Sequence, residues 1–325
     1  MLMPKRTVIL GGVGLIGTHL CLRLLREGYE VFCVDIRNLC DSPLLREARD
    51  YENFRFIRHN IIHSYGIRCD EIYNLASPPC LHYDKALPVQ MLKVNISGSV
   101  NTLETARAEQ ARVVFASSGD ICGHTRRDMP AEESYYNTIG TILGEAKRSA
   151  EAFHRAYRIE YGVDTRIARI FNTYGPGTDL NDRRAVPHMI TCALLNRDIV
   201  IHGSGEQTRS FCWVEDTVDG LVRLMAARED KGRLSTVNLG GTHEISVRAL
   251  AERIIELTGS RSRLRHIESR YNDPGRKIAD ISLARRELKW MPTVSLTEGL
   301  QRTIAYIEKE MSKIGYASRT WVEVH

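Results

Sequence analysis

The sequence predicts an α/β fold, a doubly wound parallel sheet followed by a smaller mixed α/β lobe. Two observations predict this fold. Short apolar runs alternate with helical segments through the N-terminal half, as in chains that build parallel sheets. A glycine-rich turn joins the first apolar run to the first helical segment. The chain has 325 residues, and we expect domains at residues 1–175 and 176–325, with some interleaved segments.

The first strand, first helix and second strand follow one another without interruption. Residues 7–10 form an apolar run typical of a buried parallel strand, and residues 11–17 supply the glycine-rich turn. Residues 19–27 show helical periodicity, and residues 30–35 form a second strand that ends in Asp35. This order of elements is the context in which a glycine motif indicates a dinucleotide site.

The glycine positions suit a bound pyrophosphate. Gly11 permits the tight turn, Gly14 lets the backbone approach the phosphates, and Gly17 lets the helix pack close to the strand. The positive end of the helix then faces the pyrophosphate. Asp35 is placed for the ribose hydroxyls and repels the extra phosphate of NADP, so NAD is favoured, although Arg37 slightly weakens that preference. The expected cofactor-binding residues are Gly11, Gly14, Leu15, Ile16, Gly17, Asp35, Leu75 and Ala76.

More strands extend the predicted sheet. They are expected at residues 54–58, 71–76, 112–118 and 165–171, with a helix at residues 89–107. In such sheets ligands gather at the carboxyl ends of the strands. The residues expected at those ends are Asp35, Ala76, Ser118 and Asn172. The binding site is therefore predicted along this edge of the sheet.

Composition and charge argue against several other classes of protein. The net charge is +5, from 45 basic and 40 acidic residues, and no basic stripe with stacking aromatic residues indicates nucleic-acid binding. No apolar stretch is long enough to span a membrane, and the N-terminus leads into a strand rather than a signal peptide. The eight cysteines lack zinc-like spacing, so we expect no metal, and reduced thiols in the cytoplasm.

Several longer motifs extend through the whole chain. They lie at residues 11–17, 76–78 with His82 and Tyr83, 95–98, 168–176, 207–211, 273–277 and 280–281. In these motifs the chain resembles the extended short-chain dehydrogenases/reductases that act on nucleotide sugars, which have the Rossmann fold. Within that group it is most similar to the UDP-glucuronate decarboxylases, over nearly the whole length.

The resemblance implies a reaction that uses and regenerates its cofactor. In the family, NAD oxidises a sugar at C4, the 4-keto sugar loses carbon dioxide, and NADH reduces the ketone again. The implied substrate is a UDP-sugar, and in particular one whose sugar is a uronic acid. The resemblance also implies a homodimer formed through helices near residues 95–108 and 146–161.

One residue of the family pattern is missing. The family base is a tyrosine four residues before a lysine; Lys147 matches the lysine, but Leu143 stands in the tyrosine position. None of the 13 tyrosines is followed by a lysine four positions later. Loss of an acid–base group typically lowers the rate about a hundred- to ten-thousand-fold. The alternatives for the base are Tyr136, less readily Tyr135, from a shortened loop, Asp120, or Cys122, whose better explanation is a small buried filler.

Other catalytic roles are implied by the same resemblance. Lys147 holds the nicotinamide ribose, and Ser118 matches the serine or threonine that shares the proton. Asp120 takes the place of a family glutamate that helps decarboxylation, and is one methylene shorter. The predicted catalytic set is Ser118, Asp120, Lys147, Tyr136 and Arg276.

Substrate-binding residues are implied in the C-terminal half. Arg209 matches a family residue that grips the diphosphate, since a guanidinium donates two bonds to a phosphate at once. Either Arg276 or Lys277 matches a family arginine near the sugar carboxylate, with the register open by one residue. The other expected substrate-binding residues are His82, Tyr83 and Asn172.

Three functions remain open at this point. The first is a UDP-glucuronate decarboxylase-like enzyme with an atypical base. The second is a neighbouring reaction on a nucleotide sugar: epimerisation, dehydration or one-way 4-oxidation. The third is a protein that binds NAD and a sugar nucleotide with weak catalysis, which the leucine at position 143 keeps open.

Overall fold

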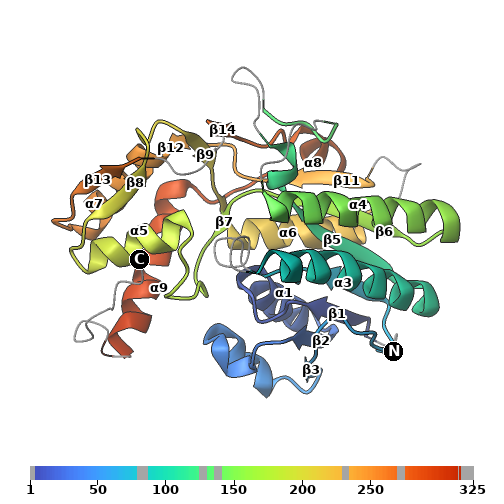
Figure 1. Cartoon of the computed structure of the whole chain (residues 1–325). Coiled ribbons are helices and arrows are strands. Elements are labelled where there is room, and N and C mark those ends of the chain that lie inside the picture. Colours follow the sequence, from blue (N-terminus) through green and yellow to red (C-terminus); the bar gives the residue numbers. More distant parts are fainter. Residues whose placement is uncertain are drawn as a thin grey trace.

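The fold is organised around a seven-stranded sheet with the order β11-β6-β5-β4-β1-β2-β3 (Figure 1). The computed structural model describes residues 4–78, 87–123, 130–134, 141–228, 234–268, 275–313 and 315. The strands of the sheet are β1 (Arg6–Leu10), β2 (Glu30–Asp35), β3 (Phe54–Arg58), β4 (Glu71–Asn74), β5 (Arg112–Ser118), β6 (Thr165–Ile170) and β11 (Thr236–Leu239). All neighbours pair in parallel, so the predicted doubly wound α/β fold is confirmed.

The direction of winding reverses beside β1. The chain runs outward from β1 through β2 to β3, then returns to β4 on the other side of β1 and continues to β5 and β6. Leu10 at the end of β1 pairs with Val34 on one side and with Asn74 on the other. Ligands of doubly wound sheets bind at such a switch point, and the glycine-rich turn begins there.

Helices cover both faces of the sheet (Figure 1). They are α1 (Leu15–Arg26), α3 (Pro88–Glu109), α4 (Ile142–Tyr161), α6 (Val214–Ala226) and α8 (Ser282–Glu287). Ile9 belongs to the core formed with α1 and α6, whereas its neighbours Val8 and Leu10 belong to the core formed with α3. This alternation follows from the period of two along a strand. None of the helices in the described ranges is long and apolar enough to cross a bilayer.

The C-terminal lobe has its own apolar core and smaller sheets. Its elements are β7 (Thr173–Tyr174), α5 (Ala185–Leu194), β8 (Ile199–His202), β9 (Thr208–Ser210), β10 (Cys212–Trp213), β12 (Glu244–Ser246), α7 (Val247–Thr258), β13 (Leu264–Ile267), β14 (Arg276–Lys277) and α9 (Leu296–Lys313). Strands β12, β9 and β14 form a three-stranded sheet. Side chains of α5, α7 and α9 pack together in this core, among them Ile190, Ile254 and Leu300.

Segments from the second half of the chain complete the first lobe. Strand β11 extends the central sheet next to β6, and α6 covers it. The segment 130–134 is also held by later residues: the Ala131 N–H donates to the Ile278 carbonyl at 2.9 Å, and the Asp280 N–H donates to the Ala131 carbonyl at 2.9 Å. The Asn238 side chain donates to that same carbonyl at 2.9 Å. The two halves of the sequence are therefore interwoven near the site.

A buried ion pair ties the elements of this region together. The Arg169 guanidinium on β6 donates to both carboxylate oxygens of Glu151 on α4, at 3.0 and 2.9 Å, and both side chains are fully buried. Ser117 on β5 donates its hydroxyl proton to Glu151 at 2.6 Å. Arg169 also donates to the Glu133 carbonyl at 2.6 Å. One pair thus joins α4, two central strands and the segment 130–134.

Arg169→Met should destabilise the protein by about 3–5 kcal/mol, because it leaves the Glu151 charge buried without its partner. Urea unfolding monitored by circular dichroism measures the change. The double variant Glu151→Gln/Arg169→Met removes both charges and should recover most of that loss. Equal stability of the single variant and the wild type would contradict the role assigned to this pair.

Candidate active site

The turn after β1 brings backbone close to where a ligand would lie. Gly11 has a φ of +78°, which favours glycine, and a Cβ there would lie 2.8 Å from the Ala76 backbone. A Cβ at Gly17 would lie 2.3 Å from the Gly11 carbonyl oxygen. Gly14 precedes α1, and no side chain caps the start of this helix. The residues therefore fit a dinucleotide pyrophosphate at a helix N-terminus.

The other expected cofactor residues surround this turn. Leu75 and Ala76 follow β4, and the Leu75 N–H donates to the Leu10 carbonyl at 2.9 Å, which holds this strand end against the glycine turn. Leu15 and Ile16 begin α1 and pack against the core of the C-terminal lobe. The cradle thus lies between the two lobes.

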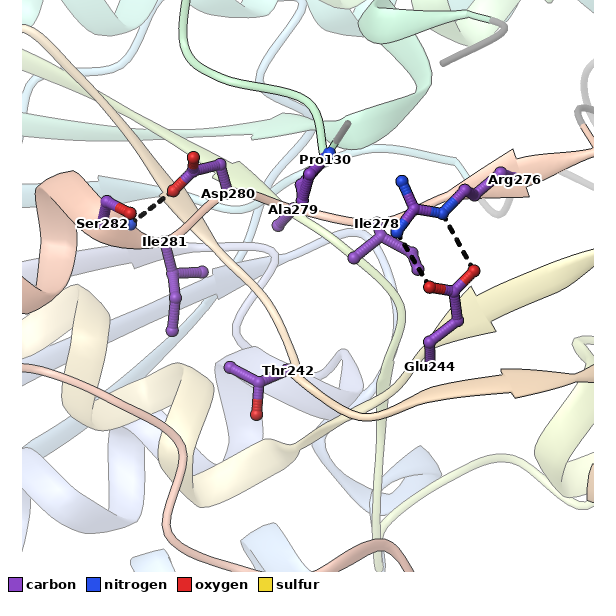
Figure 2. A pocket seen from close by; sticks show the side chains of 9 residues that line it. All are labelled: Pro130, Thr242, Glu244, Arg276, Ile278, Ala279, Asp280, Ile281 and Ser282. Carbon is purple, nitrogen blue, oxygen red and sulfur yellow. Dashed lines mark hydrogen bonds and ion pairs between the residues drawn. The ribbon is translucent and has the colours of Figure 1, made fainter. Parts of the chain in front are cut away.

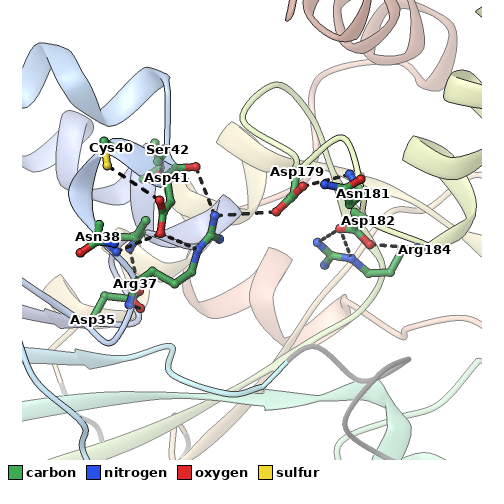
Figure 3. Close-up of polar contacts among 12 residues, drawn as sticks. Asp35, Arg37, Asn38, Cys40, Asp41, Ser42, Asp179, Asn181, Asp182 and Arg184 are labelled. Atoms are coloured by element: carbon green, nitrogen blue, oxygen red, sulfur yellow. Dashed lines mark hydrogen bonds and ion pairs between the residues drawn. The ribbon is translucent and has the colours of Figure 1, made fainter. Parts of the chain in front are cut away.

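Asp35 ends β2 with its carboxylate already oriented. One oxygen accepts the Val13 N–H at 2.9 Å and the other accepts the Arg37 N–H at 3.0 Å, and the residue is buried. Each carboxylate oxygen keeps capacity for another donor, such as a ribose hydroxyl. The Arg37 guanidinium lies between two other carboxylates, 3.9 Å from Asp41 and 3.8 Å from Asp179 (Figure 3). Both carboxylates partly neutralise the charge of Arg37, which reduces the attraction of this guanidinium for an additional phosphate.

Lys147 lies buried beneath the carboxyl end of β5. Its ammonium donates to the Ala116 carbonyl at 2.7 Å and lies 4.8 Å from the centroid of the Phe115 ring. Burial lowers the pKa of Lys147 to about 7, although the Glu151 carboxylate one turn later opposes that shift. The amine therefore changes its charge near neutral pH.

Ser118, Asp120 and Lys277 form a hydrogen-bonded chain. The Ser118 hydroxyl donates to one Asp120 oxygen at 3.1 Å, and the Lys277 ammonium forms an ion pair with the other. Burial by itself would raise the pKa of Asp120, but Lys277, Ser118 and the charge of Arg209 together hold that pKa below its ordinary value. Asp120 is therefore ionised across the neutral range.

The structure separates the two cations that the sequence left open. Arg276 and Lys277 are consecutive residues of β14, so their side chains lie on opposite faces of the strand. Lys277 reaches Asp120, whereas Arg276 forms a two-bond ion pair with Glu244 at 2.9 and 2.8 Å (Figure 2). Arg276 was expected in the catalytic set; in the structure it is Lys277, and not Arg276, that contacts Asp120.

Arg276 lines a separate cavity of about 320 Å³. Its walls also include Glu244, Thr242, Pro130 and the segment 278–282 (Figure 2). Glu244 accepts a hydrogen bond from Thr208 at 2.6 Å, which places the pair on one face of β9. Because Arg209 and Lys277 are register partners across β9 and β14, the cavity lies on the other face of this small sheet.

Asn172 and Arg209 connect the C-terminal lobe to the strand ends. The Asn172 side chain donates to the Ser210 carbonyl at 3.0 Å, and the Asn172 backbone carbonyl accepts the Cys212 N–H at 2.8 Å. Arg209 is buried and donates to the Thr208 carbonyl at 2.7 Å. Asn172 therefore positions the strand that carries Arg209.

The alternatives for the missing base differ in their burial and in their neighbours. Leu143 is buried in an apolar cluster with Met91 and Ala146. Cys122 is fully buried, and burial raises the pKa of its thiol to about 11, which suits a filler rather than a base. Asp120 remains beside Ser118. Tyr135, Tyr136, His82 and Tyr83 lie outside the described residues.

Sequence reasoning missed the residues beneath the site. Ser117, Glu151 and Arg169 were not predicted to have a role, yet their network supports both β5 and the helix of Lys147. A signal was present, because Glu151 follows Lys147 by four residues and so lies on the same face of α4. Its partner Arg169 is distant in sequence, and no local pattern identifies such a pair.

Comparison with known proteins identifies the family. The model of the NAD dependent epimerase/dehydratase family matches residues 7–240. The chain belongs to this family. Membership confirms the predicted NAD cofactor and the predicted class of enzyme.

Individual relatives match nearly the whole chain. UDP-glucuronic acid decarboxylase 1 of Xenopus tropicalis is 38% identical over 311 residues, covering 94% of this chain and 73% of that protein. UDP-glucose 4-epimerase of Thermotoga maritima, solved with UDP-glucose, has a TM-score of 0.85 at 26% identity, covering 94% and 99% of the two chains. UDP-glucuronic acid 4-epimerase of Bacillus cereus, solved with UDP-glucuronic acid and NAD, has a TM-score of 0.86 at 24% identity and the same coverage. This last likeness shows the fold.

Gly17→Ala should weaken NAD binding about tenfold or more, because a methyl group there would collide with backbone that cannot move aside. Calorimetric titration with NAD measures the affinity. Gly66→Ala is the matched control, since a Cβ at Gly66 would meet nothing within 4 Å. The same affinity in both variants would count against the close packing of the glycine turn.

The stability of the wild type relative to Lys147→Met should depend on pH. In the unfolded chain the lysine keeps its proton up to about 10.5, whereas in the folded chain its pKa is about 7. Between these values the unfolded state binds more protons, so the wild type should gain stability relative to the variant as pH rises. Urea unfolding of both proteins at pH 6, 8 and 9.5 measures this difference, and a constant difference would contradict the lowered pKa.

Proposed function

We propose that this protein is an NAD-dependent decarboxylase of UDP-glucuronate, acting through C4 oxidation of the sugar. The observation that carries the proposal is the placement of Lys277 and Arg209 around Asp120, beside Ser118 and next to the cofactor cradle. Two cations at this point suit a substrate that has both a diphosphate and a carboxylate. The 38% identity with a UDP-glucuronic acid decarboxylase supports the same substrate.

Each side of the site has a distinct task in this proposal. The glycine turn and Asp35 bind the pyrophosphate and ribose of NAD, and Lys147 holds the nicotinamide ribose. Bound NAD supplies reversible oxidation and reduction at C4 of the sugar. Arg209 binds the diphosphate, and Lys277 binds the sugar carboxylate. Ser118 donates to or accepts from the C4 hydroxyl, and Asp120 orients Ser118.

The proposed reaction follows from the chemistry of the sugar. A ketone at C4 stands β to the carboxylate carbon, so it can accept the electron pair released when the C5–C6 bond breaks. Carbon dioxide leaves, C5 takes a proton, and reduction of the ketone gives a UDP-pentose. Lys277 holds the carboxylate in place until that bond breaks.

A second candidate function is slow or absent turnover with retained binding. Leu143 favours it, because a leucine cannot take the proton that the family tyrosine would take. An epimerase-like reaction would retain the six-carbon sugar, and product analysis by NMR distinguishes it from decarboxylation. Binding of NAD and UDP-glucuronate without any product would establish the second candidate.

We also infer a homodimer formed through α3 and α4, which lie against each other on one face of the sheet (Figure 1). Large apolar side chains are exposed on these helices: Ile159 at 85%, Val89 at 62% and Phe153 at 38%.

A cytoplasmic location is part of the proposal. The seven cysteines in the described part of the chain are free thiols, and those of Cys21, Cys33, Cys69 and Cys122 are buried. Free thiols suit a reducing compartment.

Leu143→Tyr should raise the rate of carbon dioxide release from UDP-glucuronate by about tenfold or more, because it restores a proton acceptor four residues before Lys147. Release of label from carboxyl-labelled substrate measures the rate, with NAD added. Leu143→Phe is the matched control, which adds the ring without the hydroxyl. If the tyrosine variant is no faster than the phenylalanine variant, the missing phenol is not what limits turnover.

A further inference from the structure

The Asp120 carboxylate divides its two oxygens between two kinds of partner. Oδ1 is paired with the Lys277 ammonium, and Oδ2 accepts the Ser118 hydroxyl proton at 3.1 Å. The Ser118 oxygen in turn accepts the Asp120 N–H at 3.1 Å. A hydroxyl oxygen has two lone pairs, so Ser118 can accept one more proton donor. Asp120 and Ser118 therefore form a route for a proton.

Lys277 controls how well this route accepts a proton. With the ammonium and Arg209 close to it, the pKa of Asp120 stays below its ordinary value, and the carboxylate is a weak base. Removing an opposite charge from a carboxylate raises its pKa. Bases work best when their pKa lies near the operating pH. Any ligand that takes Lys277 away from Asp120 would thus strengthen Asp120 as a base.

A second carboxylate is the group best suited to draw the Lys277 ammonium away from Asp120. The Lys277 side chain is only 12% exposed and that of Asp120 is 24% exposed, so the pair is mostly shielded from solvent. Lysine carries three donors on a flexible stem and can turn from one carboxylate to another without leaving its strand. A neutral hydroxymethyl group in the same place would not draw it from an ionised aspartate.

Resting on the proposed function, we propose that the sugar carboxylate takes Lys277 from Asp120, and that the released Asp120 accepts the C4 hydroxyl proton through Ser118. Asp120 thereby replaces the tyrosine for which Leu143 stands. Oxidation at C4 is then limited to sugars that carry a carboxylate, because a neutral sugar leaves Lys277 on Asp120.

The proton and electron changes balance in this step. The hydroxyl proton passes to the Ser118 oxygen as the Ser118 proton passes to Asp120 Oδ2, so the carboxylate becomes a neutral carboxylic acid. The C4–H bond breaks, and the hydrogen would pass as hydride, with both electrons of that bond, to the oxidised nicotinamide dinucleotide that the proposed function supplies. C4 becomes a ketone, and the Asp120 proton is available for the return step.

The first test measures protons rather than turnover. UDP-glucuronate or UDP-glucose is titrated into the full chain loaded with NADH, which prevents oxidation, at pH 5 in two buffers that differ in ionisation enthalpy. Binding of UDP-glucuronate should be accompanied by net proton uptake, because it raises the pKa of Asp120. UDP-glucose should take up none.

Variants assign that uptake to the pair. Asp120→Asn should abolish it, and Lys277→Arg should retain it. Lys309→Gln, which removes an exposed cation of α9, is the matched control and should retain it as well. Binding of UDP-glucuronate without proton uptake, or equal uptake with both sugars, would overturn the exchange while the proposed function stands. Failure to bind either sugar would overturn both.

The second test separates oxidation from loss of carbon dioxide. In a single turnover with NAD, Asp120→Asn should lower the rate of NADH formation, followed by absorbance at 340 nm, about a hundredfold or more. If NADH instead formed at the wild-type rate and only carbon dioxide release fell, Asp120 would not be the proton acceptor. Lys277→Met frees Asp120 permanently and should increase the oxidation of UDP-glucose, a gain that general damage to the fold would not produce.

Discussion

The ion pair between Glu151 and Arg169 is the interaction on which the site depends. Both charges are completely buried, so each is tolerated only because the other is there. The pair fixes α4 one turn after Lys147 and, through the Ser117 hydroxyl, holds the end of β5 that carries Ser118. It therefore sets the relative position of the cofactor lysine and the strand end. The Glu151 carboxylate also favours the charged form of Lys147, against the effect of burial.

Much of the first lobe could be predicted because its signals are local. The turn at residues 11–17 carries its own glycine requirements, and Gly11 does adopt the positive φ that the motif demands. The predicted strands are short runs in which apolar residues are continuous or interspersed with polar ones, and such a pattern can be found without a distant partner. Strand β11 was missed, although it joins the same sheet, because segments of the C-terminal lobe separate it in the sequence from its neighbour β6. Pairing of distant segments leaves no periodicity in either one.

The site was predictable in its residue types but not in its pairings. Ser118 and Asp120 were expected at the end of one strand, and they are hydrogen-bonded there. The choice between Arg276 and Lys277 could not be made, because a shift of one residue along a strand exchanges its faces. Only the register of β14 against β9 decides which cation meets Asp120. The identity of a partner thus depends on tertiary structure even where the motif is clear.

The backbone hydrogen bonds of Ala131 with Ile278 and Asp280 have a consequence for synthesis on the ribosome. These residues emerge roughly 150 positions after Ala131, which is on the order of 10 s at typical elongation rates. Until β11 also emerges, β6 is an unpaired edge strand, and such edges invite association with other chains. The nascent first lobe therefore passes through a period in which chaperones have an open strand to protect.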